Sequence, residues 1–263
     1  MMKSLIAFTI LIILPMIIVY QSPTWIQRAS GLPVGDARLL NAATEGNVAE
    51  IRRALADRIP VNTADSAGYT AIHSAVMSGN RQAVQMLLAA GADVSAVSGD
   101  GTTCLALAAG GHHWDLIPLL LKAGADPNQL CPNRVTPLYI ACLSGHGPTV
   151  ELLLNAGADV NGRASNGATP AIAVAVAEDD AAFILRQLIH HGADINATEE
   201  SGYTALMYAA ERGHADLVCI LLAHGADPMR VNHAGRSARM LAEQTRNWQV
   251  ASMLRSTKNR PHA

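Results

Sequence analysis

Aromatic residues make up only 4% of this chain, although half of it is hydrophobic. Two phenylalanines, five tyrosines and three tryptophans leave few flat rings that could stack on nucleic-acid bases or on a haem. The apolar core must therefore be built from leucine, alanine and other aliphatic side chains, which suits closely packed helices. The composition argues against base-stacking and haem-binding proteins.

The sequence also lacks the motifs of several enzyme classes. It contains no Gly-x-Ser-x-Gly, no phosphate-binding glycine loop ending in Lys-Ser/Thr, no Gly-x-Gly-x-x-Gly, no His-Glu-x-x-His and no Cys-x-x-Cys. One dense carboxylate cluster occurs, at residues 178–180, and we interpret it as a longer turn between helices, with a cation or substrate site as the alternative. We expect no catalytic residues, no cofactor and no metal site.

What the chain does contain is a repeated tripeptide, Gly-Ala-Asp, which occurs five times. The gaps between successive copies are 33, 33, 35 and 33 residues. A fixed period of this length is typical of a solenoid, in which each unit buries its apolar face against its neighbours. The glycines of the five copies are Gly91, Gly124, Gly157, Gly192 and Gly225.

A second signal in the same register predicts two helices per unit. A hydroxyl residue suited to cap a helix stands two positions after a glycine in most units, and proline follows it twice, at Pro137 and Pro170. A short apolar helix should end at Gly46, Gly79 or the equivalent glycine, and a second helix should end at Gly-Ala-Asp. The capping residues are Thr70, Thr103, Thr136, Thr169, Thr204 and Ser237.

The pattern Gly-x-Thr-Pro-Leu-His-x-Ala, best seen at residues 68–75 and 136–141, resembles the ankyrin repeat, and the resemblance covers residues 35–254. It implies an all-α repeat solenoid, an ankyrin-like stack of about seven helix-turn-helix units with extended turn fingers. We expect one domain over 35–263, whose first and last units act as caps with polar outer faces. The units are 35–67, 68–100, 101–133, 134–166, 167–201, 202–234 and 235–263.

Residues 1–31 differ from everything that follows. Lys3 precedes an uncharged apolar run at residues 5–20, and a short polar linker follows. This segment predicts either a cleaved signal peptide or an uncleaved signal anchor, and the sequence leaves both open. In either case the positive charge at the N-terminus favours export of the repeats. An uncleaved signal anchor would also keep the N-terminal segment in contact with the membrane.

An export signal before ankyrin-like repeats is similar to the arrangement in exported bacterial ankyrin-repeat proteins, although the sequence does not show the kingdom of origin. The resemblance implies a location in the periplasm or at the outer face of the inner membrane. It also implies binding of a partner protein, as a scaffold for, or an inhibitor of, another exported protein. Two alternatives stay open: an immunity protein that neutralises a secreted toxin, and a secreted effector that acts on host proteins.

Charge is unevenly distributed along the chain. Residues 31–228 carry 10 Lys and Arg against 20 Asp and Glu, a net charge of −10, whereas residues 229–263 carry 7 against 1, a net charge of +6. An acidic solenoid repels phosphate backbones, so we expect no nucleic-acid partner and favour a protein partner with a basic surface. The basic end is interpreted as a solvated cap, with weak contact to an anionic surface as the alternative. We expect a monomer.

The ankyrin resemblance implies that a partner binds in a concave groove lined by the turn tips and the first helices. Two positions of each unit should line it: the residue after the opening glycine and a residue near the end of the first helix. Apolar side chains there predict an interaction patch. The candidate groove residues are Tyr69, Met77, Val135, Leu143, Val176, Tyr203 and Glu211.

Histidines and cysteines are explained by the repeat register. His73 occupies a position where the ring should bond to nearby backbone, and His191 and His224 should be exposed at helix ends. Cys142 and Cys219 fall at apolar helix positions, so we expect cysteine to act as a small hydrophobe rather than in a structural disulfide. The sequence leaves open whether any cysteines pair.

Overall fold

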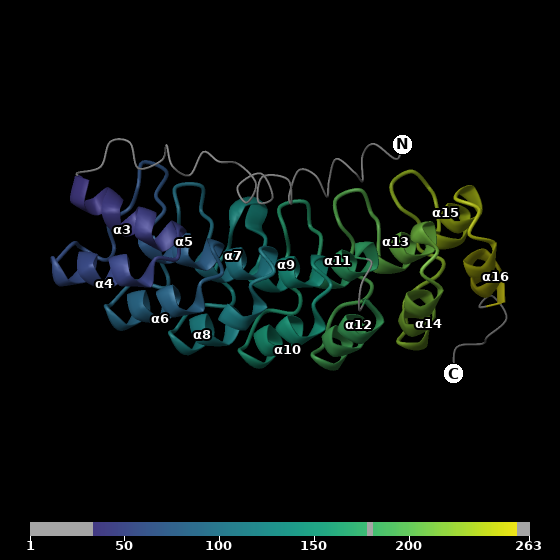
Figure 1. The fold of residues 1–263 in the computed structure, drawn as a ribbon. Helices are drawn as coiled ribbons and strands as arrows, with labels where there is room; N and C mark the ends of the chain where they lie inside the picture. The colour runs from purple at the N-terminus through teal and green to yellow at the C-terminus, as the bar shows by residue number, and fades with distance from the viewer. Residues whose placement is uncertain (1–33, 178–180, 257–263) are drawn as a thin grey trace. The chain divides into compact units, whose positions relative to one another are not determined.

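A computed structural model of the chain describes residues 34–177 and 181–256. It has fourteen α-helices and no strand in these ranges, which confirms the predicted all-α repeat solenoid (Figure 1). The chain forms two compact units, residues 1–133 and 134–263. The predicted export segment, residues 1–31, and the acidic cluster at 178–180 lie outside the described residues.

Unit 1 contains three helical hairpins. The first helices of the hairpins pack side by side, α3 against α5 and α5 against α7, and α4 likewise packs on α6. The helices are α3 (Val34–Thr44), α4 (Val48–Ala56), α5 (Ala71–Met77), α6 (Arg81–Ala89), α7 (Cys104–Gly110) and α8 (Ile117–Lys122); a short 3₁₀ turn, Trp114–Leu116, precedes α8.

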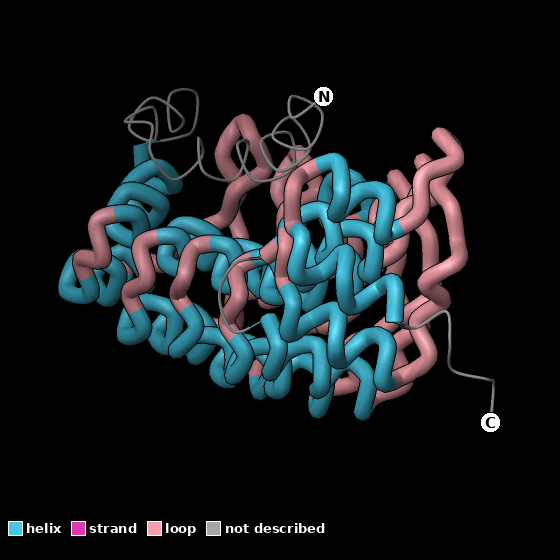
Figure 2. The backbone as a smooth tube through the Cα atoms, turned by 90° about the vertical axis from the view of Figure 1, so that its right-hand side faces the viewer, coloured by secondary structure: helices cyan, strands magenta, loops and turns pink. Residues whose placement is uncertain are grey.

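Unit 2 contains four hairpins with the same arrangement. Its first helices form one row and its second helices another, with long loops extending from the first row (Figure 2). The helices are α9 (Pro137–Leu143), α10 (Gly147–Asn155), α11 (Pro170–Val176), α12 (Ala181–His190), α13 (Ala205–Arg212), α14 (Ala215–Ala223), α15 (Ala238–Gln244) and α16 (Trp248–Ser256); a 3₁₀ turn, Pro132–Arg134, spans the junction of the two units.

The predicted hydroxyl residues stand at the N-caps of the first helices. Thr103, Thr136 and Thr204 each accept a hydrogen bond from the backbone N–H three residues on, at 3.2 Å. Such a bond satisfies a donor that the start of a helix would otherwise leave unpaired. Thr169 is an exception, because its buried hydroxyl has no hydrogen-bond partner among the described residues.

In the Gly-Ala-Asp turns, residues of the tripeptide themselves make the hydrogen bonds that end the second helices. Gly91 has a φ of 86°, a region that favours glycine, and lets the Ala92 N–H bond to the Leu87 carbonyl at 3.0 Å. The Asp93 carboxylate then accepts the Ser95 N–H at 2.9 Å. The same carboxylate contact closes the other four turns, at Asp126, Asp159, Asp194 and Asp227.

Asparagines bind three of the Gly-Ala-Asp turns, those at Gly91, Gly192 and Gly225, to the repeat before each of them. The Asn196 side chain donates to the Gly225 carbonyl at 3.0 Å and accepts the Asp227 N–H at 2.9 Å. Asn62 and Asn161 make the same pair of bonds to the turns that follow them. Neighbouring repeats are therefore joined by directional bonds as well as by apolar packing.

Pairs of adjacent apolar residues near the ends of the second helices contribute to the core. The first leucine of every pair is fully buried. Burial of an aliphatic side chain of this size stabilises the fold by about 1.5–3 kcal/mol. These residues are Leu87, Leu120, Leu153, Leu188 and Leu221.

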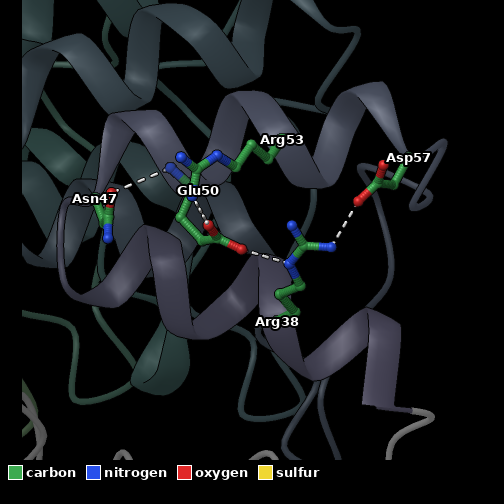
Figure 3. A network of polar contacts seen from close by, with 5 residues as sticks. All are labelled: Arg38, Asn47, Glu50, Arg53 and Asp57. Atoms are coloured by element: carbon green, nitrogen blue, oxygen red, sulfur yellow. Dashed lines mark hydrogen bonds and ion pairs between the residues drawn. The ribbon is translucent and has the colours of Figure 1, made fainter.

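The first repeat departs from the pattern at its start. The helix α3 begins at Val34, so Gly35 lies inside the helix and does not precede it as the sequence predicts. No capping hydroxyl follows Gly35 to stop the helix from extending towards the N-terminus. Arg38 of α3 pairs with Glu50 of α4 and, at 2.6 Å, with Asp57, which forms an ion-paired cap (Figure 3).

Histidine and cysteine positions agree with the repeat register, with one exception. The His73 ring accepts the Thr70 N–H at Nδ1 (3.2 Å), so its Nε2 donates to the Ala96 carbonyl (3.1 Å). His191 and His224 are exposed, as expected. All four cysteines are free; Cys142 is buried but Cys219 is exposed, because it lies on the solvent side of α14.

Candidate functional site

Each repeat presents a finger, the hairpin loop that connects one helical hairpin to the next. A backbone bond across the hairpin closes it, for example from the Asp65 N–H to the Tyr69 carbonyl at 2.9 Å. A polar side chain completes several tips: Asp65 Oδ1 accepts the N–H groups of Ala67 and Tyr69, both at 2.9 Å. Glu199 and Asn232 play the same part in unit 2.

Fingers within a unit are linked to each other by single backbone bonds. In unit 1 the Gly99 N–H donates to the Ala67 carbonyl at 2.7 Å. In unit 2 the Glu200 N–H donates to the Asn166 carbonyl at 2.8 Å, and the His233 N–H to the Ser201 carbonyl at 3.0 Å. The fingers therefore hold their side chains at fixed spacings, which is a requirement for a preorganised binding surface.

The expectation that Tyr69 and Val135 are exposed is wrong. Tyr69 is 4% exposed, with its ring edge-on to His73, and its hydroxyl donates to Asp100 at 3.3 Å; Val135 is 3% exposed. Thr102 and Ala168, in the same position of their repeats, are buried as well. This position lies at the base of the finger, where apolar atoms are removed from water.

The other five predicted residues keep partial access to solvent. Met77 belongs to unit 1, where it ends α5. In unit 2, Leu143 and Val176 end α9 and α11, and Glu211 lies in the last turn of α13. Tyr203 is half-buried, whereas Tyr69, Thr102, Val135 and Ala168 in the same position are buried. The term finger face of unit 2 denotes the surface defined by Leu143, Val176, Tyr203 and Glu211.

Aromatic rings and carboxylates meet at one end of this face. The Tyr203 and Tyr208 ring centroids are 4.9 Å apart. Burial raises the pKa of both phenols, and the negative charges of Glu199 and Glu211 contribute further. Burial also raises the pKa of the Glu211 carboxyl, because its charged form is incompletely hydrated.

Glu211 has no ion-pair partner among the residues that the structure describes. The nearby Arg236 side chain instead donates from Nη1 to Gln244 Oε1 at 3.1 Å. A half-buried carboxylate beside two phenol rings is suited to receive a cationic group. The finger face of unit 2 thus changes from apolar, at Leu143 and Val176, to aromatic and acidic.

Three residues of this surface were missed from the sequence. Tyr208 lies on the first helix and Glu199 in the finger, and both fall outside the two positions considered. Arg236 occupies the Tyr203 position of the last repeat, so extending the same register by one unit would have found it.

Within the described parts of the chain, no group of three or more His, Cys, Asp or Glu side chains is placed to hold a metal ion. No helix in those parts is both long and apolar enough to cross a bilayer.

Family models match three stretches that together exceed half of the chain. Residues 39–88 and 188–242 match models described as ankyrin repeats in many copies, and residues 91–164 match a model of three ankyrin repeats. The matches lie within the repeat region that the sequence register predicts, and residues 165–187 fall between two of them.

Curated relatives are similar over short stretches. The human NAD-capped RNA hydrolase NUDT12 is 37% identical over 84 residues, which is 32% of this chain and 18% of that protein. The potassium channel AKT1 of Oryza sativa subsp. japonica is 36% identical over 85 residues, which is 32% of this chain and 9% of the channel. The chain thus spans a fifth or less of these relatives, and the matched segment carries no conclusion about their activities.

Solved structures are similar over most of the chain. The ankyrin repeat domain of human ASB11 has a TM-score of 0.73 at 23% identity, covering 86% of this chain and 99% of that chain. The ankyrin repeat domain of Bcl-3, described as a unique member of the IkappaB protein family, has a TM-score of 0.71 at 29% identity and covers 84% and 99%.

Proposed function

The chain belongs to the ankyrin-repeat family, and we propose that it is an exported binding protein that docks a partner protein on the finger face of unit 2. Ankyrin repeats generally mediate protein–protein interaction, and the fold is typically a non-catalytic scaffold. Binding is stoichiometric, and the partner is an exported protein that this chain supports or inhibits.

The observation that carries this proposal is the half-buried Glu211 carboxylate, which lies beside Tyr203 and Tyr208 without an ion-pair partner among the described residues. Burial costs the half-buried Glu211 charge part of its hydration, and the charges of Arg236 and Arg212 offset this only in part, so a basic group supplied by another protein would stabilise it further. The apolar neighbours Leu143 and Val176 supply area that a partner can cover. A partner with a basic residue next to an apolar segment fits this surface.

Site-specific photo-crosslinking in the cell tests the surface. A crosslinking residue at position 203 should capture the partner, whereas one at the exposed Gln85 of α6, on a second helix, should not. Capture from position 85 alone would place the interface on the second helices and contradict the proposal.

Charge-matched variants then test the basic partner. Glu211→Gln should weaken the captured complex by more than about 1 kcal/mol, as expected of a central interface residue, and should reduce its dependence on salt. Glu200→Gln, which removes an exposed carboxylate of the same unit, should change neither. Equal effects of the two variants would show that only overall charge matters.

Export is a separate part of the proposal and rests on Lys3 and the apolar run at residues 5–20. It places the repeats in the periplasm or at the outer face of the inner membrane. Reporter fusions after Gly31 and after Leu254 should both be active outside the cytoplasm. Activity of both fusions only in the cytoplasm would contradict export, but it would not bear on the proposal that the finger face of unit 2 binds a partner.

A further inference from the structure

The C-terminal end of unit 2 exposes three large apolar side chains on the side where no further repeat lies in the described residues. Met229 is 61% exposed in the finger before α15, Met240 is 48% exposed on α15, and Trp248 is 61% exposed at the start of α16. The three residues and the charged side chains between them are called the end face; the charged residues are Arg239, Glu243, Arg246 and Arg255.

Equivalent positions in upstream repeats show that these side chains share one side of the repeat. Met229 takes the place of Asn196, whose amide binds the turn of the following repeat at Gly225 and Asp227. Met240 takes the place of Met207, which is only 1% exposed. At the C-terminal end of unit 2 these two positions hold Met229 and Met240, whose apolar side chains contact water.

Trp248 follows the same rule. It takes the place of Gly147, where a Cβ atom would lie 2.6 Å from the ring of Phe183 in the following repeat. It also takes the place of Arg81, whose guanidinium reaches Asp115 of the following repeat. The finger, the first helix and the second helix therefore each contribute one apolar group to the end face.

Basic side chains lie between these apolar groups. Arg239 and Arg255 both approach Glu243, at 3.7 and 2.7 Å, and the Glu243 pKa is lowered, chiefly by its hydrogen bond from Arg255. Arg246 is exposed and forms no ion pair with a described residue. The end face carries an excess of positive charge.

The first repeat has no comparable patch. None of its residues from 37 to 67 is an exposed large hydrophobic side chain, and Arg38, Glu50 and Asp57 form its ion-paired cap. The sequence predicted polar caps at both ends. The prediction is wrong for the last repeat at Met240 and Trp248, where apolar groups stand beside the ion pairs.

We propose that the end face binds the surface of an anionic lipid bilayer. A stacked protein helix would bury the Arg239–Glu243–Arg255 network, and removing such charges from water is costly. The headgroup layer of a bilayer leaves the charges hydrated beside lipid phosphates, while the tryptophan and methionine side chains reach the boundary of the acyl chains. The charge and the spacing of apolar groups therefore both favour a bilayer.

This surface is separate from the finger face, because it uses neither Tyr203 nor Glu211. Failure of one proposal thus leaves the other standing. Docking by the end face would bring α16 against the bilayer.

The test follows the Trp248 indole on vesicles with the full-length protein. Vesicles of phosphatidylcholine alone are compared with vesicles containing phosphatidylglycerol and brominated acyl chains, and the Trp248 signal is the difference between wild type and Trp248→Phe. Quenching and a blue shift should occur on the anionic vesicles and be reversed by salt. Residues 1–33 are common to both proteins, so their contribution cancels in the difference.

Substitutions identify the contacts. Arg246→Gln should raise the lipid concentration needed for half-maximal Trp248 quenching about fivefold, the effect of one basic residue near an anionic surface. Met240→Ser should raise it several-fold. The controls Arg186→Gln, an exposed arginine of α12, and Leu152→Ser, a 38% exposed residue of α10, should leave it unchanged.

Two results would overturn the proposal. The first is an absence of Trp248 quenching on anionic vesicles. The second is a photo-crosslink from position 248 to another protein without any quenching, which would make the end face a protein interface instead.

Discussion

Gly79 shows how a single residue controls the contact between two repeats. It follows α5 with a φ of 66°, and a Cβ atom there would lie 2.4 Å from Nδ1 of His113 in the following repeat. His113 bonds through Nε2 to the Met77 carbonyl at 3.0 Å. Glycine at this position therefore allows the positive φ of the turn and also leaves room for the His113 ring of the following repeat.

We expect Gly79→Ala to destabilise unit 1 more than Gly91→Ala does. Both glycines have positive φ, so both substitutions carry a backbone cost of about 1 kcal/mol or more. Only Gly79 adds a steric clash, since no atom lies within 4 Å of the Cβ position at Gly91. Chemical denaturation should show a further loss of about 1–3 kcal/mol for Gly79→Ala. Equal losses would mean that His113 moves aside at little cost.

His73 gives a prediction for pH. Burial lowers the pKa of its ring below 6.5, because the charged form would lose its hydration, and the hydrogen bond to the Ala96 carbonyl offsets this only in part. The unfolded chain then binds more protons than the folded chain near pH 6, so stability is complete above pH 6.5 and falls as the pH drops towards the folded pKa.

The measurement is the thermal midpoint between pH 7.5 and pH 5, compared in wild type and His73→Gln. The variant should have a lower thermal midpoint than wild type at neutral pH, and its midpoint should fall less as the pH is lowered. A midpoint whose pH dependence is the same in both proteins would show that His73 does not titrate in this range.

At the scale of the helices, α10 carries two adjacent leucines, of which one lies in the core and the other at the surface. Leu153 is fully buried and Leu152 is 38% exposed. Leu153→Ala should therefore cost about 2–5 kcal/mol of unfolding free energy. Leu152→Ala should cost about 1 kcal/mol or less, since much of its side chain already contacts water. Urea titration of both variants checks the difference, and similar losses would contradict the register of α10.

Local signals made most of the helices predictable from the sequence. A threonine cap such as Thr136 and a turn such as that at Asp93 depend on residues three or four positions apart, which the repeat displays several times. Burial of Tyr69 was not predictable in this way, because it depends on His73 and Asp100 in adjoining parts of the fold. The exposed Met240 was missed because the same position is core in the upstream repeats, and no described repeat packs on it here.

At the scale of the whole molecule, the repeat period predicts which deletions unit 2 tolerates. Removing residues 202–234 takes out one complete repeat and allows α11 to pack on α15 as α13 now does. Removing residues 202–217 leaves α11 facing part of a second helix. In a chain whose repeats contact only neighbours, the first deletion should keep the helix content per residue and the second should lose it.

Circular dichroism at matched concentrations checks this prediction. A variant of similar length that removes residues 218–234 serves as a second out-of-register control. Equal loss of helix in the complete-repeat variant and the two half-repeat variants would contradict the phasing of the units.

The asparagines that bind successive turns have one further consequence. The amide hydrogens of Asp93, Asp194 and Asp227 lie on the exposed side of their turns, yet each is held by a side chain of the repeat before it. Their rates of exchange with deuterated solvent therefore report on the opening of a neighbour rather than on the turn itself. Loosening of one repeat, by heat or by a bound partner, would appear one period further along the chain.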